Sequence, residues 1–207
     1  MHFNLSKKKS QVSRWKRLSL ALIILIGAWL SLSALYLPTK AYVAQYLIAD
    51  AWEKTLNEGG HNKPWSWADT HPIAKLGFPS LQETLYVLAG ANGRNMAFGP
   101  AHTLSSGMPG QPLSTVISAH RDSHFAPLKH LRKGDVIDIQ TTTGQFQYRI
   151  TELQIRDSRT QRIPIQRKDQ LILTTCYPFD ALTSGGPMRY QVTAERIPSA
   201  PQLASAF

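Results

Sequence analysis

Short segments with strand character follow one another from about residue 80 onward and constrain the fold of the chain more than any other feature. In each segment, apolar and β-branched residues alternate with polar ones or form a short apolar run, and turn residues separate the segments. Several short strands at this spacing are typical of a β-barrel or β-sandwich. We therefore expect a mainly β fold with short helices, such as one or two turns within residues 125–135. The expected strands lie at residues 83–90, 114–120, 133–157 (a hairpin), 170–176 and 189–197.

A long uncharged segment, Leu18–Leu37, precedes these strands. A helix of that length spans roughly 30 Å, the thickness of a bilayer core. Lysine and arginine residues come before the segment, and such residues usually stay in the cytoplasm. We therefore expect an N-terminal transmembrane helix that leaves the N-terminus in the cytoplasm and exports the rest of the chain. A cleaved signal peptide is the alternative, although its apolar region is normally only about 7–15 residues long.

The pattern divides the chain into five parts. A helix expected at residues 41–57 ends at Gly59 and Gly60, and a proline-containing linker at residues 61–79 follows it. The expected parts are a basic cytoplasmic tail (1–17), the anchor (18–37), a helix and linker (38–79), the strand-rich domain (80–197) and a C-terminal tail (198–207).

The formal net charge of +10 would suit a nucleic-acid-binding protein. Much of the excess, however, lies in the N-terminal tail, which has no acidic residue, and basic residues beside an anchor usually set its topology. We therefore expect no nucleic-acid partner. The basic residues of the tail are Lys7, Lys8, Lys9, Arg14, Lys16 and Arg17.

Cys176 is the only cysteine, so an internal disulfide is excluded and the thiol is either an inert buried group or a reactive one. The thiolate is the reactive form, and a nearby cation favours it. His120 and Arg189 are the candidate cations, which adjacent strands would have to bring together. Cys176 would then attack a peptide carbonyl, His120 would protonate the leaving amine, and Arg189 would orient the substrate or stabilise the oxyanion. An ordinary strand-end histidine and a surface arginine are the competing interpretations.

His120 and His124 also have the i, i+4 spacing that can bind a metal on a helix. The preceding residues have strand character, however, and Asp122 is the only carboxylate between the two histidines. We therefore expect neither a metal site nor a cofactor.

Three motifs together resemble the catalytic motifs of sortases: SAHRDSHF (118–125), LTTCYPF (173–179) and PMRY (187–190). The resemblance covers roughly residues 40–197 and is strongest to class D-like sortases. The segments KPWSWADT (63–70) and AFGPAH (97–102) are similar to sortases of Gram-negative proteobacteria. One position departs from the family pattern, because Ile172 stands where the family has a threonine.

This resemblance implies an eight-stranded sortase β-barrel with Cys176, His120 and Arg189 as the catalytic triad. It also implies that the substrate is a protein with a C-terminal Leu-Pro-x-Thr-Gly-like signal, cleaved between Thr and Gly. We expect the residues that flank the nucleophile, Thr174, Thr175 and Tyr177, to bind this substrate. The resemblance to Gram-negative sortases implies a catalytic domain in the periplasm, an anchor in the inner membrane and an amine acceptor that the sequence leaves open. Residues 156–169 are basic, so we expect no calcium site of the kind that some sortases have.

Other function classes fit the sequence less well. An L,D-transpeptidase would have a Ser-His-Gly-Cys type motif, and a papain-like peptidase would place its cysteine before its histidine. A non-catalytic exported β-domain remains the main alternative, and it predicts that Cys176 reacts no faster than a model thiol.

Overall fold

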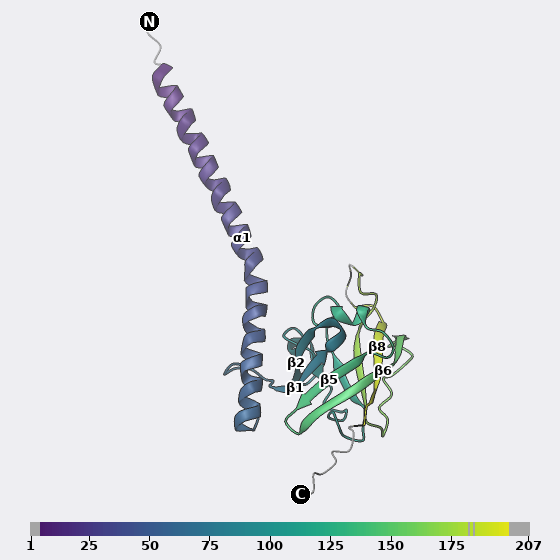
Figure 1. Ribbon diagram of the computed structural model, residues 1–207. Helices are drawn as coiled ribbons and strands as arrows, with labels where there is room; N and C mark the ends of the chain where they lie inside the picture. Colours follow the sequence, from purple (N-terminus) through teal and green to yellow (C-terminus); the bar gives the residue numbers. More distant parts are fainter. Residues whose placement is uncertain (1–4, 182, 184, 199–207) are drawn as a thin grey trace. The chain divides into compact units, whose positions relative to one another are not determined.

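The computed structural model describes residues 5–181, 183 and 185–198, and the chain forms two compact units, residues 1–43 and 44–207. Helix α1 (Leu5–Glu58) runs through both units (Figure 1) and includes the helix expected at residues 41–57. It ends before Gly59 and Gly60, both at φ +76°. Residues other than glycine rarely adopt this backbone conformation, so these glycines suit a helix end.

The N-terminal unit is helical over its described residues, with apolar side chains such as Leu22, Ile24 and Trp29 exposed. Within the described residues, no helix combines the length and the apolar character that a membrane span requires. The expected anchor, residues 18–37, falls partly outside that description, because the side chains at positions 31, 32 and 34–37 are not described. Residues 1–4 of the expected tail and residues 199–207 of the C-terminal tail also lie outside it.

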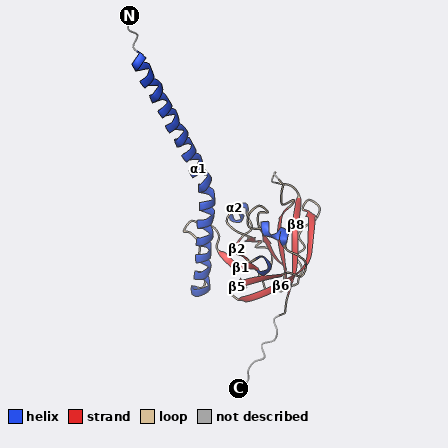
Figure 2. Ribbon diagram, turned by 45° about the horizontal axis from the view of Figure 1, so that its top comes forward, coloured by secondary structure: helices blue, strands red, loops and turns tan. Residues whose placement is uncertain are grey.

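The second unit contains a closed eight-stranded β-barrel, in agreement with the expected fold (Figure 2). Its strands are arranged around the barrel in the order β1-β2-β3-β4-β7-β8-β6-β5. Within the described residues, three short helices lie between strands: η1 (Pro79–Leu81), α2 (Gly93–Met96) and η2 (Ala126–His130). The strands are β1 (Pro72–Phe78), β2 (Glu83–Ala89), β3 (Ala101–His102), β4 (Thr115–Ser118), β5 (Val136–Thr141), β6 (Gly144–Asp157), β7 (Gln170–Cys176) and β8 (Met188–Arg196).

The barrel begins earlier than the sequence pattern indicated. Strand β1 lies in residues that we had assigned to the linker, so the expected domain start at residue 80 is wrong. The segment PIAKLGF alternates buried and half-buried residues and pairs with both β2 and β5, which closes the barrel. Pro72 is tolerated because it is the first residue of the strand, where a missing N–H costs least.

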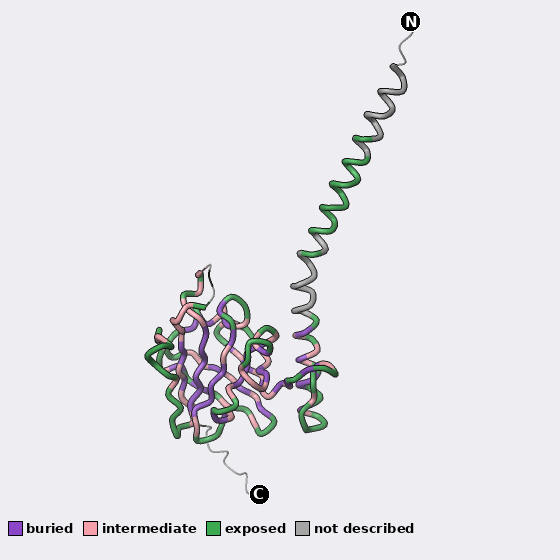
Figure 3. The backbone as a smooth tube through the Cα atoms, turned by 180° about the vertical axis from the view of Figure 1, so that it is seen from behind, coloured by how far each residue is buried: buried purple, intermediate pink, exposed green. Residues whose placement is uncertain are grey.

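The inner face of the barrel forms the main hydrophobic core. Side chains alternate between the two faces of each strand, so every second residue points inward. On β7 the inward residues include Leu171 and Leu173, and on β8 they include Val192 and Ala194. Figure 3 shows the resulting buried stretches along the barrel strands. The residues between these inward positions, including Cys176, therefore face outward.

The C-terminal end of α1 belongs to the same unit as the barrel. Ile48 and Trp52 are fully buried, and Ile48 packs with Leu88 and Ala101 of β2 and β3. The Gln45 side chain also donates a hydrogen bond to the Phe98 carbonyl. Residues 44–58 are therefore part of the folded domain.

Candidate active site

The strand topology brings three distant motifs to one end of the barrel. Strands β4 and β7 are parallel neighbours, so their C-terminal ends lie at the same edge. Strand β8 is antiparallel to β7 and therefore starts at that edge, and β6, antiparallel to β8, ends there. Four groups of residues therefore lie at the same end of the barrel: those after β4, the last residue of β7, the first residues of β8 and the last residues of β6.

Cys176 is the last residue of β7 and lies directly opposite Arg189 of β8 in the strand register. Facing residues on antiparallel strands have Cα atoms about 4.5–5.5 Å apart, and their side chains point to the same face. The thiol is half-buried and has no disulfide partner. The side chains of Cys176 and Arg189 therefore project from the same face of the barrel wall.

Two backbone carbonyls hold the guanidinium of Arg189. Its Nη1 donates to the Gly186 carbonyl oxygen at 2.6 Å and to the Met188 carbonyl oxygen at 3.0 Å. These contacts occupy one end of the fork and restrict its position. A cation held in place can stabilise an oxyanion that forms nearby.

His120 is exposed two residues after the end of β4. Its backbone carbonyl accepts a hydrogen bond from Phe125 N (3.0 Å), and Phe125 is fully buried, which anchors the turn that carries the imidazole. His124 lies in the same turn, not on a helix, so the spacing expected of a helical metal pair does not apply. Burial lowers the pKa of His124, although a hydrogen bond to the Ala97 backbone acts in the opposite direction. Among the described residues, no three side chains of the metal-binding types form a cluster.

The three expected substrate-binding residues have different surroundings. Thr174 and Thr175 line the same cavity as Cys176, and Thr175 Oγ1 donates to the Ala119 carbonyl at 2.7 Å. That hydrogen bond fixes β7 to the residue before His120. Tyr177 stacks against Tyr190 at 6.4 Å and is not among the described residues that line the cavity. Tyr177 thus belongs to an aromatic cluster with Phe179 and Tyr190.

A cavity of about 490 Å³ joins all three candidate catalytic residues. Its wall includes two arginines that the sequence analysis did not single out, Arg156 and Arg162, and none of its described lining residues is acidic. Arginines at a strand end and in a loop carry no motif, so only the tertiary arrangement could identify them. The lining residues are Met96, Ser118, Ala119, His120, Arg156, Ser158, Gln161, Arg162, Ile163, Thr174, Thr175, Cys176, Arg189 and Gln191.

Arg121, directly after His120, was also missed as a separate functional residue. It is only 8% exposed, and its Nη2 donates to the carbonyl oxygens of Ala181 (2.9 Å) and Thr183 (2.6 Å). These carbonyls belong to the loop that follows Cys176. Arg121 therefore ties the histidine turn to the loop after the nucleophile.

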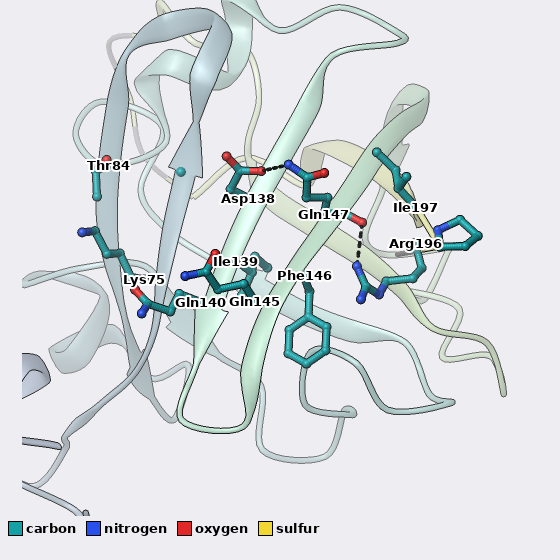
Figure 4. Close-up of a pocket in the computed structure, with 12 residues that line it drawn as sticks. Lys75, Thr84, Asp138, Ile139, Gln140, Gln145, Phe146, Gln147, Arg196 and Ile197 are labelled. Atoms are coloured by element: carbon teal, nitrogen blue, oxygen red, sulfur yellow. Dashed lines mark hydrogen bonds between the residues drawn. The ribbon is translucent and has the colours of Figure 1, made fainter. Parts of the chain in front are cut away.

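A second cavity of about 510 Å³ lies elsewhere, on β1, β5, β6 and β8. Figure 4 shows its polar wall, in which Gln147 Nε2 donates to Asp138 Oδ1 at 2.9 Å and Arg196 donates to the Gln147 carbonyl. Its described lining contains neither a cysteine nor a histidine. This cavity therefore lacks the two residue types on which the expected cysteine chemistry depends.

Comparison with known proteins relates this chain to one protein family. The family model described as "Sortase domain" matches residues 76–197, which include all three candidate catalytic residues. Sortase D of Bacillus subtilis (strain 168) is 33% identical over 124 residues, which are 59% of this chain and 62% of that protein. The match thus spans less than two thirds of the relative.

Solved structures share the fold. A Clostridium perfringens Sortase D5 transpeptidase superposes with a TM-score of 0.62 at 20% identity, covering 75% of this chain and 99% of the other. Sortase A from Corynebacterium diphtheriae gives a TM-score of 0.57 at 23% identity, covering 66% and 65% of the two chains. At these identities the likeness establishes the barrel fold alone.

Proposed function

The chain belongs to the sortase family, and from that premise we propose that it is a membrane-anchored cysteine transpeptidase. It cleaves a Leu-Pro-x-Thr-Gly-like sorting signal between Thr and Gly and transfers the acyl group to an amine. The observation that carries this proposal is the strand register that sets Cys176 opposite Arg189, in a cavity that His120 also lines. The 33% identity to Sortase D of Bacillus subtilis supports it.

The proposed reaction has two steps. The Cys176 thiolate attacks the threonine carbonyl carbon, and the electron pair that moves to the oxygen is stabilised by Arg189. The C–N bond breaks as protonated His120 donates a proton to the leaving glycine amine, which leaves a thioester and a neutral imidazole. An incoming amine then attacks the thioester, gives a proton back to His120 and expels the thiolate.

Mass spectrometry of the detergent-purified full chain, incubated with a sorting-signal peptide, tests this proposal. We expect an acyl-enzyme whose mass increase equals the peptide up to threonine, attached to Cys176 and absent from Cys176→Ala. His120→Ala should lower kcat/KM by about 10²–10⁴-fold and Arg189→Ala by about 10²–10³-fold. The matched controls are His130→Ala and Arg149→Ala, which change exposed side chains that do not line the cavity. Peptide cleavage that persists in Cys176→Ala would refute the proposed nucleophile.

We further propose that residues 18–37 anchor the enzyme in the inner membrane of a Gram-negative envelope, with the catalytic domain in the periplasm. The uncharged run, the basic residues before it and the exposed apolar side chains on its helix support this topology. The amine acceptor then belongs to the envelope. The substrate protein carries its sorting signal at its C-terminus.

The single cysteine provides a direct topology test. A membrane-impermeant maleimide should label Cys176 in intact spheroplasts as fully as in lysed ones, and Cys176→Ala should abolish the label. Labelling that appears only after lysis would place the domain in the cytoplasm.

A further inference from the structure

Arg156 extends the row formed by the nucleophile and its cross-strand partner. It lies directly opposite Arg189 on β6, just as Arg189 lies opposite Cys176 on β7. Side chains that face each other across neighbouring strands project from the same side of the sheet. Cys176, Arg189 and Arg156 therefore point into one cavity, which all three line.

The two arginines of this row differ in their hydrogen bonding. Arg189 is held by two backbone carbonyls. Arg156 is half-buried, and its Nε is buried with no hydrogen-bond partner among the described residues. A buried donor without a partner is costly, and more so on a charged group, so a site of this kind gains free energy when a ligand supplies the acceptor.

The cavity provides no acidic side chain that could serve as that acceptor. Its described lining contains His120 and three arginines, with no aspartate or glutamate. The carboxylate next along the chain, Asp157, pairs with Arg159 at 2.6 Å. The positive charge in the cavity is therefore not neutralised by the residues that line it.

We propose that Arg156 binds a carboxylate of the substrate, so that this enzyme prefers sorting signals with an aspartate or glutamate close to the scissile bond. Bidentate pairing with a carboxylate is the geometry for which a guanidinium is best suited. This inference rests on the proposed function and adds the chemical class of the signal. Arg156 acts as a substrate-binding residue beside the catalytic three.

The strand spacing limits where the acidic residue lies. Two strand spacings of about 4.8 Å separate β6 from β7, so the Cα atom of Arg156 is roughly 10 Å from that of Cys176. An extended peptide advances about 3.3 Å per residue. The carboxylate therefore belongs to a residue within about three positions of the cleaved bond.

Kinetics with a peptide series tests the proposal. The series is one neutral sorting peptide and variants with a single glutamate or glutamine at each position within three residues of the scissile bond. With the full chain, we expect at least one glutamate peptide to exceed its glutamine counterpart by about tenfold or more in kcat/KM, mainly through KM. Arg156→Gln should remove this preference, so that each glutamate peptide and its glutamine counterpart give the same kcat/KM. Arg156→Lys should retain part of it, because the charge remains but the two-pronged donor is lost.

Control variants separate Arg156 from general electrostatics and from damage to the fold. Arg149→Gln alters an exposed arginine of the same strand and should keep the preference for glutamate peptides. Arg162→Gln alters the other cavity arginine that is not assigned to catalysis, and it should keep the preference as well. The Arg156→Gln protein should also unfold at the temperature of the parent protein. A preference that survives Arg156→Gln, or that only Arg162→Gln removes, would overturn the inference.

The same series distinguishes this inference from the proposed function. Cleavage of all peptides at equal rates would overturn the acidic preference and leave the transpeptidase intact. Failure to cleave any peptide would overturn both. Glutamate and glutamine peptides can also be compared for binding to Cys176→Ala, which should hold the preferred glutamate peptide about tenfold more tightly.

Discussion

At the scale of single residues, the site depends on side chains that hold other groups in place as well as on those that react. Arg121 is the main example, because its buried guanidinium binds two carbonyls of the loop after Cys176. Its neighbour in the chain, His120, is by contrast exposed to the substrate cavity. Adjacent residues of one motif thus differ in their surroundings, because one binds the loop and the other lines the cavity.

Replacing Arg121 should loosen that loop. Hydrogen bonds from a charged donor contribute about 1.5–3 kcal/mol each, so Arg121→Ala should lower the unfolding free energy by at least about 2 kcal/mol. It should also raise KM for the sorting peptide, because the loop borders the nucleophile. Lys129→Ala, an exposed change beyond the same turn, is the control and should alter neither quantity. Peptide kinetics and urea unfolding measure both effects, and an unchanged KM would argue against a positioning role.

His102 should make the domain sensitive to acid. Burial lowers its pKa, and its Nε2 lies 2.9 Å from the Gly107 carbonyl while its buried Nδ1 has no partner among the described residues. His102 therefore binds a proton near pH 6.5 in the unfolded chain but only at lower pH in the folded protein. The free energy of unfolding consequently falls as the pH drops below about 6.5. Urea unfolding at pH 7.5 and 5.0 should show this loss, reduced in His102→Gln and unchanged in the exposed control His130→Gln. An equal loss in His102→Gln would assign the effect to other groups.

At the scale of elements, a tyrosine joins three segments that are distant in sequence. Tyr148 of β6 is fully buried, accepts a hydrogen bond from Gly110 N (2.9 Å) and donates one to Asp169 Oδ1 (2.7 Å). Gly110 has φ +86°, and a Cβ atom there would lie 2.4 Å from the Phe146 ring. The loop therefore needs a glycine at this position and a hydroxyl to receive its N–H.

Tyr148→Phe should destabilise the barrel without changing the chemistry. The substitution leaves the Gly110 N–H without its acceptor, which costs about 1–3 kcal/mol. Urea unfolding should show this loss, whereas the rate of Cys176 acylation should stay the same. Tyr46→Phe, which removes an exposed hydroxyl, should have no effect on stability. A neutral Tyr148→Phe would mean that water replaces the hydroxyl.

At the scale of the whole molecule, the helix α1 belongs to both units. Residues 44–58 carry the buried Ile48 and Trp52 and pack within the second unit, whereas residues 1–43 form the first. The catalytic domain therefore includes the last part of the helix. Its stability should depend on that part and not on the first unit.

Two truncations test this division. A chain of residues 44–207 should unfold within about 2 °C of the full chain, because it retains every buried contact of the barrel unit. A chain of residues 59–207 should unfold at least about 6 °C lower, because it lacks the buried tryptophan, whose removal costs about 3–5 kcal/mol. Circular dichroism melting measures both, and a barrel that unfolds on removal of residues 1–43 would contradict the division.

Local patterns were sufficient to predict most strands and the three candidate catalytic residues. Alternation with period two predicts β6 and β8 because it reflects burial of one face, which is a property of each segment by itself. Strand β2 is predicted instead by its β-branched and aromatic residues. The start of the barrel was misplaced because the prolines that border β1 resemble those of a linker. Strand β3 is only two residues long, which is too short for a pattern to predict it. The three candidate catalytic residues could be singled out because each lies in a motif of consecutive residues.

The remaining features arise from pairing between distant strands, which no local pattern encodes. The register across β6, β8 and β7 sets Arg156 beside Arg189 and Cys176, and the inward direction of Tyr190 draws Tyr177 into an aromatic cluster. The register between strands depends on loop closure and on packing of the complete barrel, so it can be determined only from the assembled tertiary structure. The amino-acid order thus specified the candidate reacting groups and most strand segments, whereas the closed barrel specified their neighbours and the charge of the cavity around them.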